Sequence, residues 1–143
     1  MSFKKGYRQP PWFAPPAHRI RFLHEIQQNA PRAEIIRPRR KYKGGFAIKT
    51  AITPTGVPTR EIEVHFSLRN PDVPQIFSDG PTDSPHRYSD SSLCIWYPYD
   101  PKEARWRPID GPTALLGHIA AHLIKEQWYR QTGEWPGDQV HHA

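Results

Sequence analysis

Proline is the feature of this sequence that most limits how the chain can fold. The 143 residues include 17 prolines, well above the usual share of about 5%. Because proline lacks a backbone N–H and has a fixed φ, it ends helices and is excluded from central strands. Regular structure must therefore lie between the prolines. Five Trp, six Tyr and six Phe argue against disorder, so we expect a single small domain with long, stiffened loops.

Two stretches have the periodicity of helices. In residues 17–29, apolar side chains recur every three positions and Pro31 follows the end. These apolar side chains are Ile20, Leu23 and Ile26. A stronger helix is predicted over residues 112–130, with Pro112 in the allowed first turn and Gly133 beyond the end. Its apolar positions are Leu115, Leu116, Ile119, Leu123 and Ile124.

Strands are predicted between the two helices, at residues 34–37, 45–52 and 60–68. The last stretch alternates most clearly between polar and apolar side chains. Its apolar positions are Ile62, Val64, Phe66 and Leu68. Residues 53–58 have the composition of a loop, which predicts an antiparallel hairpin. Residues 70–88 hold too many prolines to be regular for long.

The predicted order of helix, antiparallel strands, irregular segment and helix is an α+β layout, with the helices on one side of a small sheet. We interpret residues 1–16 as a proline-rich N-terminal arm and residues 17–143 as the domain. No apolar stretch approaches the ~18 residues of a membrane span, and no secretory signal is evident. Cys94 is the single cysteine, so we expect a cytoplasmic protein without disulfides or a cysteine-based zinc site.

Cys94 itself has two interpretations. It lies in the apolar run 93–97, and free cysteine is among the most buried residue types, which favours an inert core residue. However, an irregular proline-rich segment precedes it, and such segments carry functional sites more often than packing. That segment holds polar side chains that could gather at a thiol: His86, Arg87, Tyr88, Asp90, Ser91 and Ser92.

Residues 85–95, PHRYSDSSLCI, resemble the active-site segment of ubiquitin-conjugating enzymes, in which a His-bearing turn precedes an apolar-Cys-apolar triplet. The Trp-Arg-Pro triplet at 106–108 resembles the family's passage into its next helix. Residues 132–137, with His141 and His142 after them, are similar to a bacterial branch found in antiphage defence operons. The resemblance implies an N-terminal helix, a four-stranded antiparallel meander, an irregular segment with the cysteine, and further helices.

The resemblance also implies a function. Cys94 would accept a protein C-terminus as a thioester and pass it to an amine on a target protein. The partner would be an activating-enzyme-like protein or the C-terminal tail of a cyclic-oligonucleotide synthase, and we expect no cofactor and no metal. Two other interpretations stay open: a basic binding module with a buried, inert Cys94, and an inactive conjugating-enzyme scaffold.

The sequence departs from the family at the oxyanion donor. Eukaryotic members carry His-Pro-Asn, whereas this chain has Pro-His-Arg at 85–87, without the Asn. Backbone N–H groups around Cys94 are the first candidates for the donor, followed by the side chains of Arg87 or Ser92. Asp90, with Asp100 as the alternative, is the candidate for orienting the attacking amine and accepting its proton.

His86 is the candidate for a catalytic base or for a residue that fixes the loop. It lies eight residues before Cys94, and an extended chain would hold the two roughly 26 Å apart. Direct contact therefore requires the loop to double back. In the family that it resembles, the histidine of this motif is mainly structural.

His118 and His122 stand four residues apart on the predicted second helix, with Glu126 one turn further. This spacing suits a metal. Because other residues already supply the apolar face of the helix, we favour a solvated polar face for these three side chains.

Residues 37–43, RPRRKYK, dominate the electrostatics of a chain with net charge +6. Such a run favours nucleic-acid binding, with Tyr42 available for stacking, but a solvated strand end explains it slightly better. A third interpretation is docking of an acidic partner, and the resemblance supports it through His18, Arg19 and Arg21 on the first helix. We expect nucleic acid to be retained only weakly, at low salt.

Overall fold

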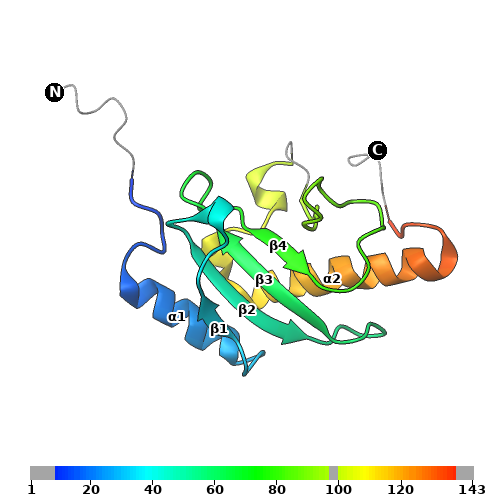
Figure 1. Cartoon of the computed structure of the whole chain (residues 1–143), viewed down its shortest axis with the longest axis horizontal. Coiled ribbons are helices and arrows are strands. Elements are labelled where there is room, and N and C mark those ends of the chain that lie inside the picture. The colour runs from blue at the N-terminus through cyan, green and yellow to red at the C-terminus, as the bar shows by residue number, and fades with distance from the viewer. Residues whose placement is uncertain (1–8, 97–99, 138–143) are drawn as a thin grey trace.

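The structure, a computed structural model, describes residues 9–96 and 100–137. Figure 1 shows its helices and strands, which in chain order are α1 (Pro16–Gln27), β1 (Glu34–Ile36), β2 (Phe46–Ile52), β3 (Arg60–Phe66), β4 (Gln75–Ser78) and α2 (Gly111–Thr132). Short 3-10 helices lie at Arg40–Tyr42, Lys102–Ala104 and Pro108–Asp110. The strands form one antiparallel meander in the order β1-β2-β3-β4. The predicted α+β fold is confirmed.

Proline and glycine set the ends of the helices. Pro16 and Pro112 occupy the first turns of α1 and α2, where the missing N–H costs no intrahelical bond. Gly133 ends α2 in the left-handed conformation, at φ 80°, and its N–H donates to the Tyr129 carbonyl at 2.7 Å. In the described part of the chain, no helix is long and apolar enough to cross a membrane.

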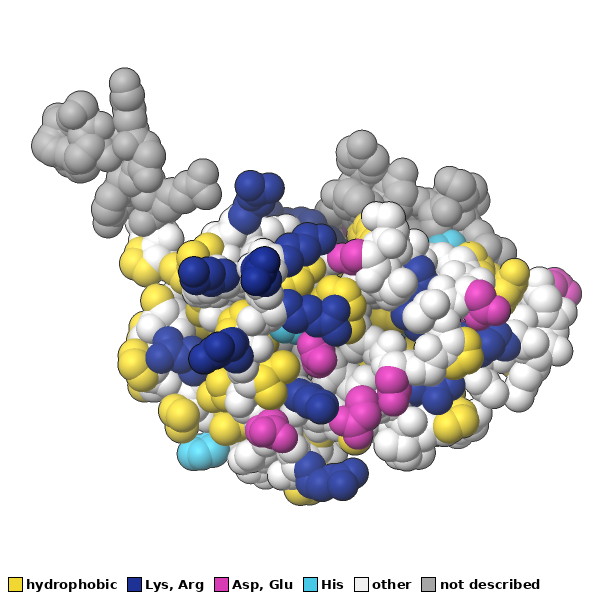
Figure 2. Space-filling model, in the orientation of Figure 1, with side chains coloured by type: hydrophobic (Ala, Val, Ile, Leu, Met, Phe, Trp, Pro, Cys, Tyr) yellow, Lys and Arg dark blue, Asp and Glu magenta, His cyan; other side chains and the backbone are white. Residues whose placement is uncertain are grey.

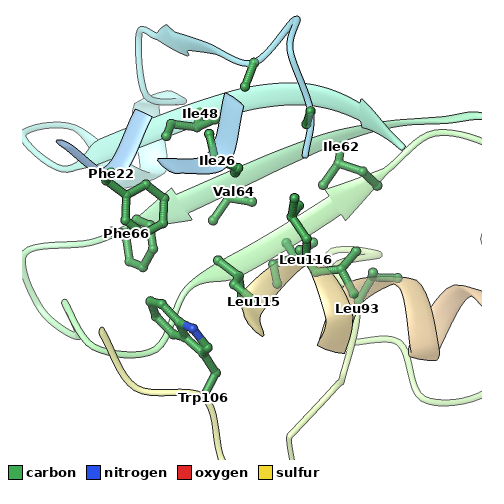
Figure 3. Close-up of a cluster of buried hydrophobic side chains, with 14 of the residues drawn as sticks. Phe22, Ile26, Ile48, Ile62, Val64, Phe66, Leu93, Trp106, Leu115 and Leu116 are labelled. Atoms are coloured by element: carbon green, nitrogen blue, oxygen red, sulfur yellow. The ribbon is translucent and has the colours of Figure 1, made fainter. Parts of the chain in front are cut away.

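The inward face of the sheet and the two helices share one hydrophobic core, part of which Figure 3 shows. Alternation along β3 points Ile62, Val64 and Phe66 into this core, where all three are fully buried. The helices and the segment before α2 supply Phe22, Ile26, Trp106, Leu115, Ile119 and Leu123. Phe13, from the residues before α1, is buried in the same cluster.

Three residues predicted to be buried are exposed instead. Leu68 is 53% exposed because β3 ends two residues before it. Ile20 and Ile124 are 46% and 39% exposed. In α1 the predicted positions are three residues apart, and because a helix turns every 3.6 residues this spacing drifts away from the buried side. Phe22 and Ile26, four residues apart, form the buried face of α1.

β4 lies inside the proline-rich segment that was predicted to be irregular. It pairs with β3 from Ile62 opposite Ser78 to His65 opposite Gln75. The four residues of β4, which lie between Pro74 and Pro81, suffice for a short edge strand. Proline is tolerated at the flanks of such a strand. This strand completes the meander and leads directly into the segment that carries Cys94.

Candidate active site

The segment that carries Cys94 doubles back on itself. Arg87 and Leu93 form an antiparallel bridge, and the Cys94 N–H donates to the His86 carbonyl at 2.8 Å. We call residues 85–94 the site hairpin. The Leu93 N–H donates to the Ile76 carbonyl at 2.9 Å, which joins the site hairpin to β4. The backbones of His86 and Cys94 are therefore neighbours, as direct contact between these two residues requires.

Asp90 shapes the turn of the site hairpin. Its Oδ1 accepts hydrogen bonds from the Ser92 N–H at 2.9 Å and from the Ser92 hydroxyl at 2.6 Å. Its Oδ2 lies 3.2 Å from Lys41 Nζ. Although partial burial would raise the pKa of Asp90, the hydrogen bonds from Ser92 and Lys41 hold it below its ordinary value. A carboxylate with a lowered pKa is a poor proton acceptor, so this geometry favours a structural role for Asp90.

Cys94 is partly exposed, whereas Leu93 and Trp96 beside it are buried. The two buried neighbours hold this part of the chain against the core, and Cys94 lies between the core and the surface. The Cys94 thiol points towards the Trp96 carbonyl, with Sγ 4.0 Å from the oxygen. Cys94 is therefore not a fully buried core residue.

Arg87 fixes the site hairpin to α2 through a buried ion pair. Its Nε and Nη2 donate to the two carboxylate oxygens of Glu126 at 2.7 and 2.8 Å, and its Nη1 donates to the Ser91 carbonyl at 2.7 Å. The side chains of Arg87 and Glu126 are only 5% and 1% exposed. In Figure 1 the segment after β4 accordingly lies beside the C-terminal half of α2.

These contacts overturn two predictions from the sequence. His122 and Glu126 do not lie on a solvated face of α2, because both are buried against the site hairpin and its surroundings. The side-chain oxyanion donors suggested by the sequence are also committed elsewhere. Arg87 is bound to Glu126, and the Ser92 hydroxyl donates within the turn to Asp90.

His86 packs against the residues that follow α2. Its ring centroid lies 4.3 Å from that of Trp135, and the ring of His122 lies 5.2 Å from the same indole. His86 also has a positive φ of 64°, a conformation that tight turns use. This packing favours the loop-fixing interpretation of His86 over the catalytic base. His141 and His142 lie outside the described residues.

His118 lies apart from His122 on the same helix, with its ring 5.4 Å from that of Trp96. Burial lowers the pKa of His118, as expected for an imidazole packed beside an indole. Within residues 9–96 and 100–137, no three His, Cys, Asp or Glu side chains are grouped to hold a metal ion.

Part of the basic run lies on the outer face of the sheet. Tyr42 is buried there and stacks on His65, with ring centroids 5.0 Å apart. Arg39 binds Glu63 at 2.9 Å and lies over the ring of Phe77. The hypothesis that Tyr42 is available to stack on nucleic-acid bases is therefore wrong.

The fold agrees with the comparison to known families. Residues 23–143 match the family model of the type II CBASS E2 protein. The chain belongs to this family. Comparisons with curated proteins and with solved structures gave no match.

Membership in the CBASS E2 family implies a ubiquitin-conjugating-like role in antiphage defence, with partners in a conjugation pathway of the same operon. The resemblance identified from the sequence is thus confirmed at the level of the family. Sequence reasoning missed one feature of the site, the pairing of Arg87 with Glu126. Tyr88 is among the polar side chains that the sequence suggested could gather at the thiol, and its hydroxyl and the Cys94 sulfur lie against the same carbonyl oxygen of Trp96.

Proposed function

We propose that this CBASS E2 protein is a conjugating enzyme of the bacterial cytoplasm. It carries a protein C-terminus as a thioester on Cys94 and transfers it to an amine of a target protein. The observation that carries the proposal is the partly exposed Cys94 at the end of a hairpin that the Leu93 N–H joins to β4 and the Arg87 side chain joins to α2. An inert core cysteine requires no such arrangement.

The reaction proceeds in two acyl transfers. In the first, the Cys94 sulfur attacks the carbonyl carbon of an incoming thioester, and the thiolate of the donor leaves. In the second, a target amine attacks the Cys94 thioester, the C–N bond forms, and the C–S bond breaks. Thioester exchange is nearly isoenergetic, so attack by the amine, which is mostly protonated at neutral pH, is the harder step.

The proposed partners follow from the family. The carried tail would be that of a cyclic-oligonucleotide synthase, delivered by an activating-enzyme-like protein or as a preformed thioester. Cys94 is the nucleophile. His86 and Asp90 act by holding the shape of the site hairpin. Asp90 orients a target amine only when its ion pair with Lys41 is broken.

Substitution of Cys94 tests the proposal. Cys94→Ala should abolish both loading and conjugation, because no nucleophile remains. Cys94→Ser should trap an ester that resists reducing agents and transfers slowly, because an alkoxide is a poorer leaving group than a thiolate. Loading and conjugation are measured for each variant by gel shift with and without reductant, in cells that carry the whole operon.

The inactive-scaffold interpretation predicts the opposite result. If conjugation and defence survive in Cys94→Ala, the scaffold interpretation is supported and the enzymatic interpretation is refuted. The matched control is Ser89→Ala, an exposed position in the turn of the site hairpin, which should load as the unsubstituted protein does.

A further inference from the structure

One step of the proposed reaction has no side chain assigned to it. The sulfur of Cys94 carries negative charge when it attacks and again when it leaves, and a nearby hydrogen-bond donor would stabilise that charge. Arg87 and Ser92 cannot supply the donor while they bind Glu126 and Asp90. The inference below concerns this step and rests on the proposed function.

Tyr88 is the polar side chain that the hairpin places beside the thiol. Cross-strand hydrogen bonds pair His86 with Cys94 and Tyr88 with Ser92. Tyr88 and Cys94 are therefore diagonal neighbours, close enough for a long side chain to reach across. The Tyr88 hydroxyl donates to the Trp96 carbonyl at 3.2 Å, and Cys94 Sγ lies 4.0 Å from the same oxygen. The two side chains converge on a single acceptor.

We propose that Tyr88 is a catalytic residue, whose hydroxyl donates a hydrogen bond to the Cys94 sulfur whenever that sulfur is charged. In the resting thiol, the hydroxyl donates to the Trp96 carbonyl. When the thiol ionises, rotation about the C–O bond of the phenol turns the hydrogen from this carbonyl to the sulfur. The hydroxyl and the sulfur already lie against the same carbonyl oxygen, so this change begins from two groups in the same part of the site hairpin.

The hydroxyl keeps its proton throughout the reaction. Burial raises the pKa of Tyr88 well above its ordinary value, and a hydrogen bond with Cys94 and the charges of Asp90 and Asp100 raise it further. Tyr88 is therefore a donor and not a base. In the transfer step, the electron pair of the broken C–S bond returns to the sulfur, where the Tyr88 hydrogen bond stabilises it, and the amine proton passes to water.

Tyr88→Phe tests this role, since it removes the hydroxyl and keeps the ring. The first readout is the pH dependence of Cys94 alkylation by iodoacetamide in the folded, full-length protein. A hydrogen bond to a charged group stabilises it enough that the alkylation rate at pH 7 should fall about tenfold. The midpoint of the pH profile should rise by about one unit. A role in packing alone would leave this midpoint unchanged.

The second readout is acyl transfer. The protein is loaded with a short peptide benzyl thioester, and discharge of the loaded form to free lysine is followed in a single turnover. We expect Tyr88→Phe to slow the discharge about tenfold. Tyr42→Phe is the matched control, because it removes a tyrosine hydroxyl on the outer face of the sheet and should change neither readout.

The possible results separate this inference from the proposed function. An unchanged alkylation profile in Tyr88→Phe, or a change that Tyr42→Phe shares, would overturn the role of Tyr88. Failure of the unsubstituted protein to accept any acyl group on Cys94 would instead refute the proposed function, while the alkylation profiles would still decide whether Tyr88 stabilises the thiolate. Equal melting temperatures of the variants show that the fold is intact.

Discussion

Glu126 shows how a single buried charge holds the site in place. The carboxylate is bound by Arg87, and it lies 3.6 Å from His122 Nε2 and 3.8 Å from Arg130 Nη1. Burial alone would raise the pKa of Glu126, but the nearby His122 ring and the hydrogen bonds from Arg87 outweigh it and lower the pKa to about 2. Removing one partner of such a pair leaves an uncompensated buried charge, which costs far more than an exposed pair would.

Acid should therefore weaken the protein through Glu126. Because its pKa is depressed from 4.5 to about 2, its stabilisation is present above about pH 4.5 and is lost as the pH falls towards 2. We expect the loss to be on the order of 3 kcal/mol. Glu126→Ala should lower the free energy of unfolding by about 3–5 kcal/mol at pH 7. Urea unfolding at pH 7 and at pH 2 measures both.

Glu25→Ala is the control for this prediction, because Glu25 is an exposed residue on α1. It should lose stability in acid as the unsubstituted protein does. Glu126→Ala should lose less, since the group responsible is already gone. An equal loss of stability in acid with and without Glu126 would contradict the prediction.

At the scale of elements, the site hairpin is held from several directions. Arg87 joins it to α2, Leu93 joins it to β4, and Lys41 joins its turn to the outer face of the sheet. The ring of Trp135, beyond the end of α2, packs against His86. The position of Cys94 therefore depends on elements that lie far apart in the sequence.

Trp135→Ala should loosen the site hairpin without unfolding the core. Loss of the indole removes the ring contact between Trp135 and His86, and the hydrogen bond from the Cys94 N–H to the His86 carbonyl should open more often. Hydrogen exchange should become faster at the Cys94 amide, while exchange at the β3 amides stays slow. Trp128→Ala, at an exposed position on α2, is the matched control. Equal exchange at Cys94 in both variants would argue against this anchor.

Most of the fold follows from patterns within single segments. Alternation locates β2 and β3, and proline with glycine locates both ends of α2. β4 was missed because four residues are too few for a periodic signal and prolines flank them. The segment around Cys94 was recognised by its motif, whereas alternation alone predicts only an apolar run.

The contacts of the site were harder to predict, because they join residues that are distant in the chain. Arg87 and Glu126 are 39 residues apart, and no local spacing relates them. The i, i+4 spacing of His122 and Glu126 was visible, but it favours a solvated face as well as a buried one. Only the packing of the site hairpin on α2 distinguishes the two.

At the scale of the whole molecule, the positive charge is unevenly distributed. Figure 2 shows Lys and Arg side chains gathered over the segment around the 3-10 helix Arg40–Tyr42. Arg39 and Lys41 form ion pairs with Glu63 and Asp90, so part of this charge is balanced within the protein. Exposed Arg40 and Lys43 contribute to the remainder.

This partial balance predicts weak, salt-sensitive retention of nucleic acid. Few cations of the segment are available to phosphates, and each neutralised phosphate adds a slope of only about 0.9 to the dependence of log affinity on log salt. Binding to a labelled DNA duplex, followed by fluorescence anisotropy, should be detectable at low salt and vanish near physiological ionic strength. The double substitution Arg40→Ala/Lys43→Ala should remove most of it.

Arg69→Ala/Lys102→Ala is the matched control, because it removes the same charge from exposed positions outside the basic run. It should reduce retention less than the substitutions at Arg40 and Lys43, since Arg69 and Lys102 do not belong to the cluster around the 3-10 helix. If only the net charge of the protein mattered, the two double variants would bind the DNA duplex equally. Tight, sequence-dependent binding at physiological salt would contradict the prediction and favour a nucleic-acid-binding module over a conjugating enzyme, because specific recognition needs contacts to bases as well as to phosphates.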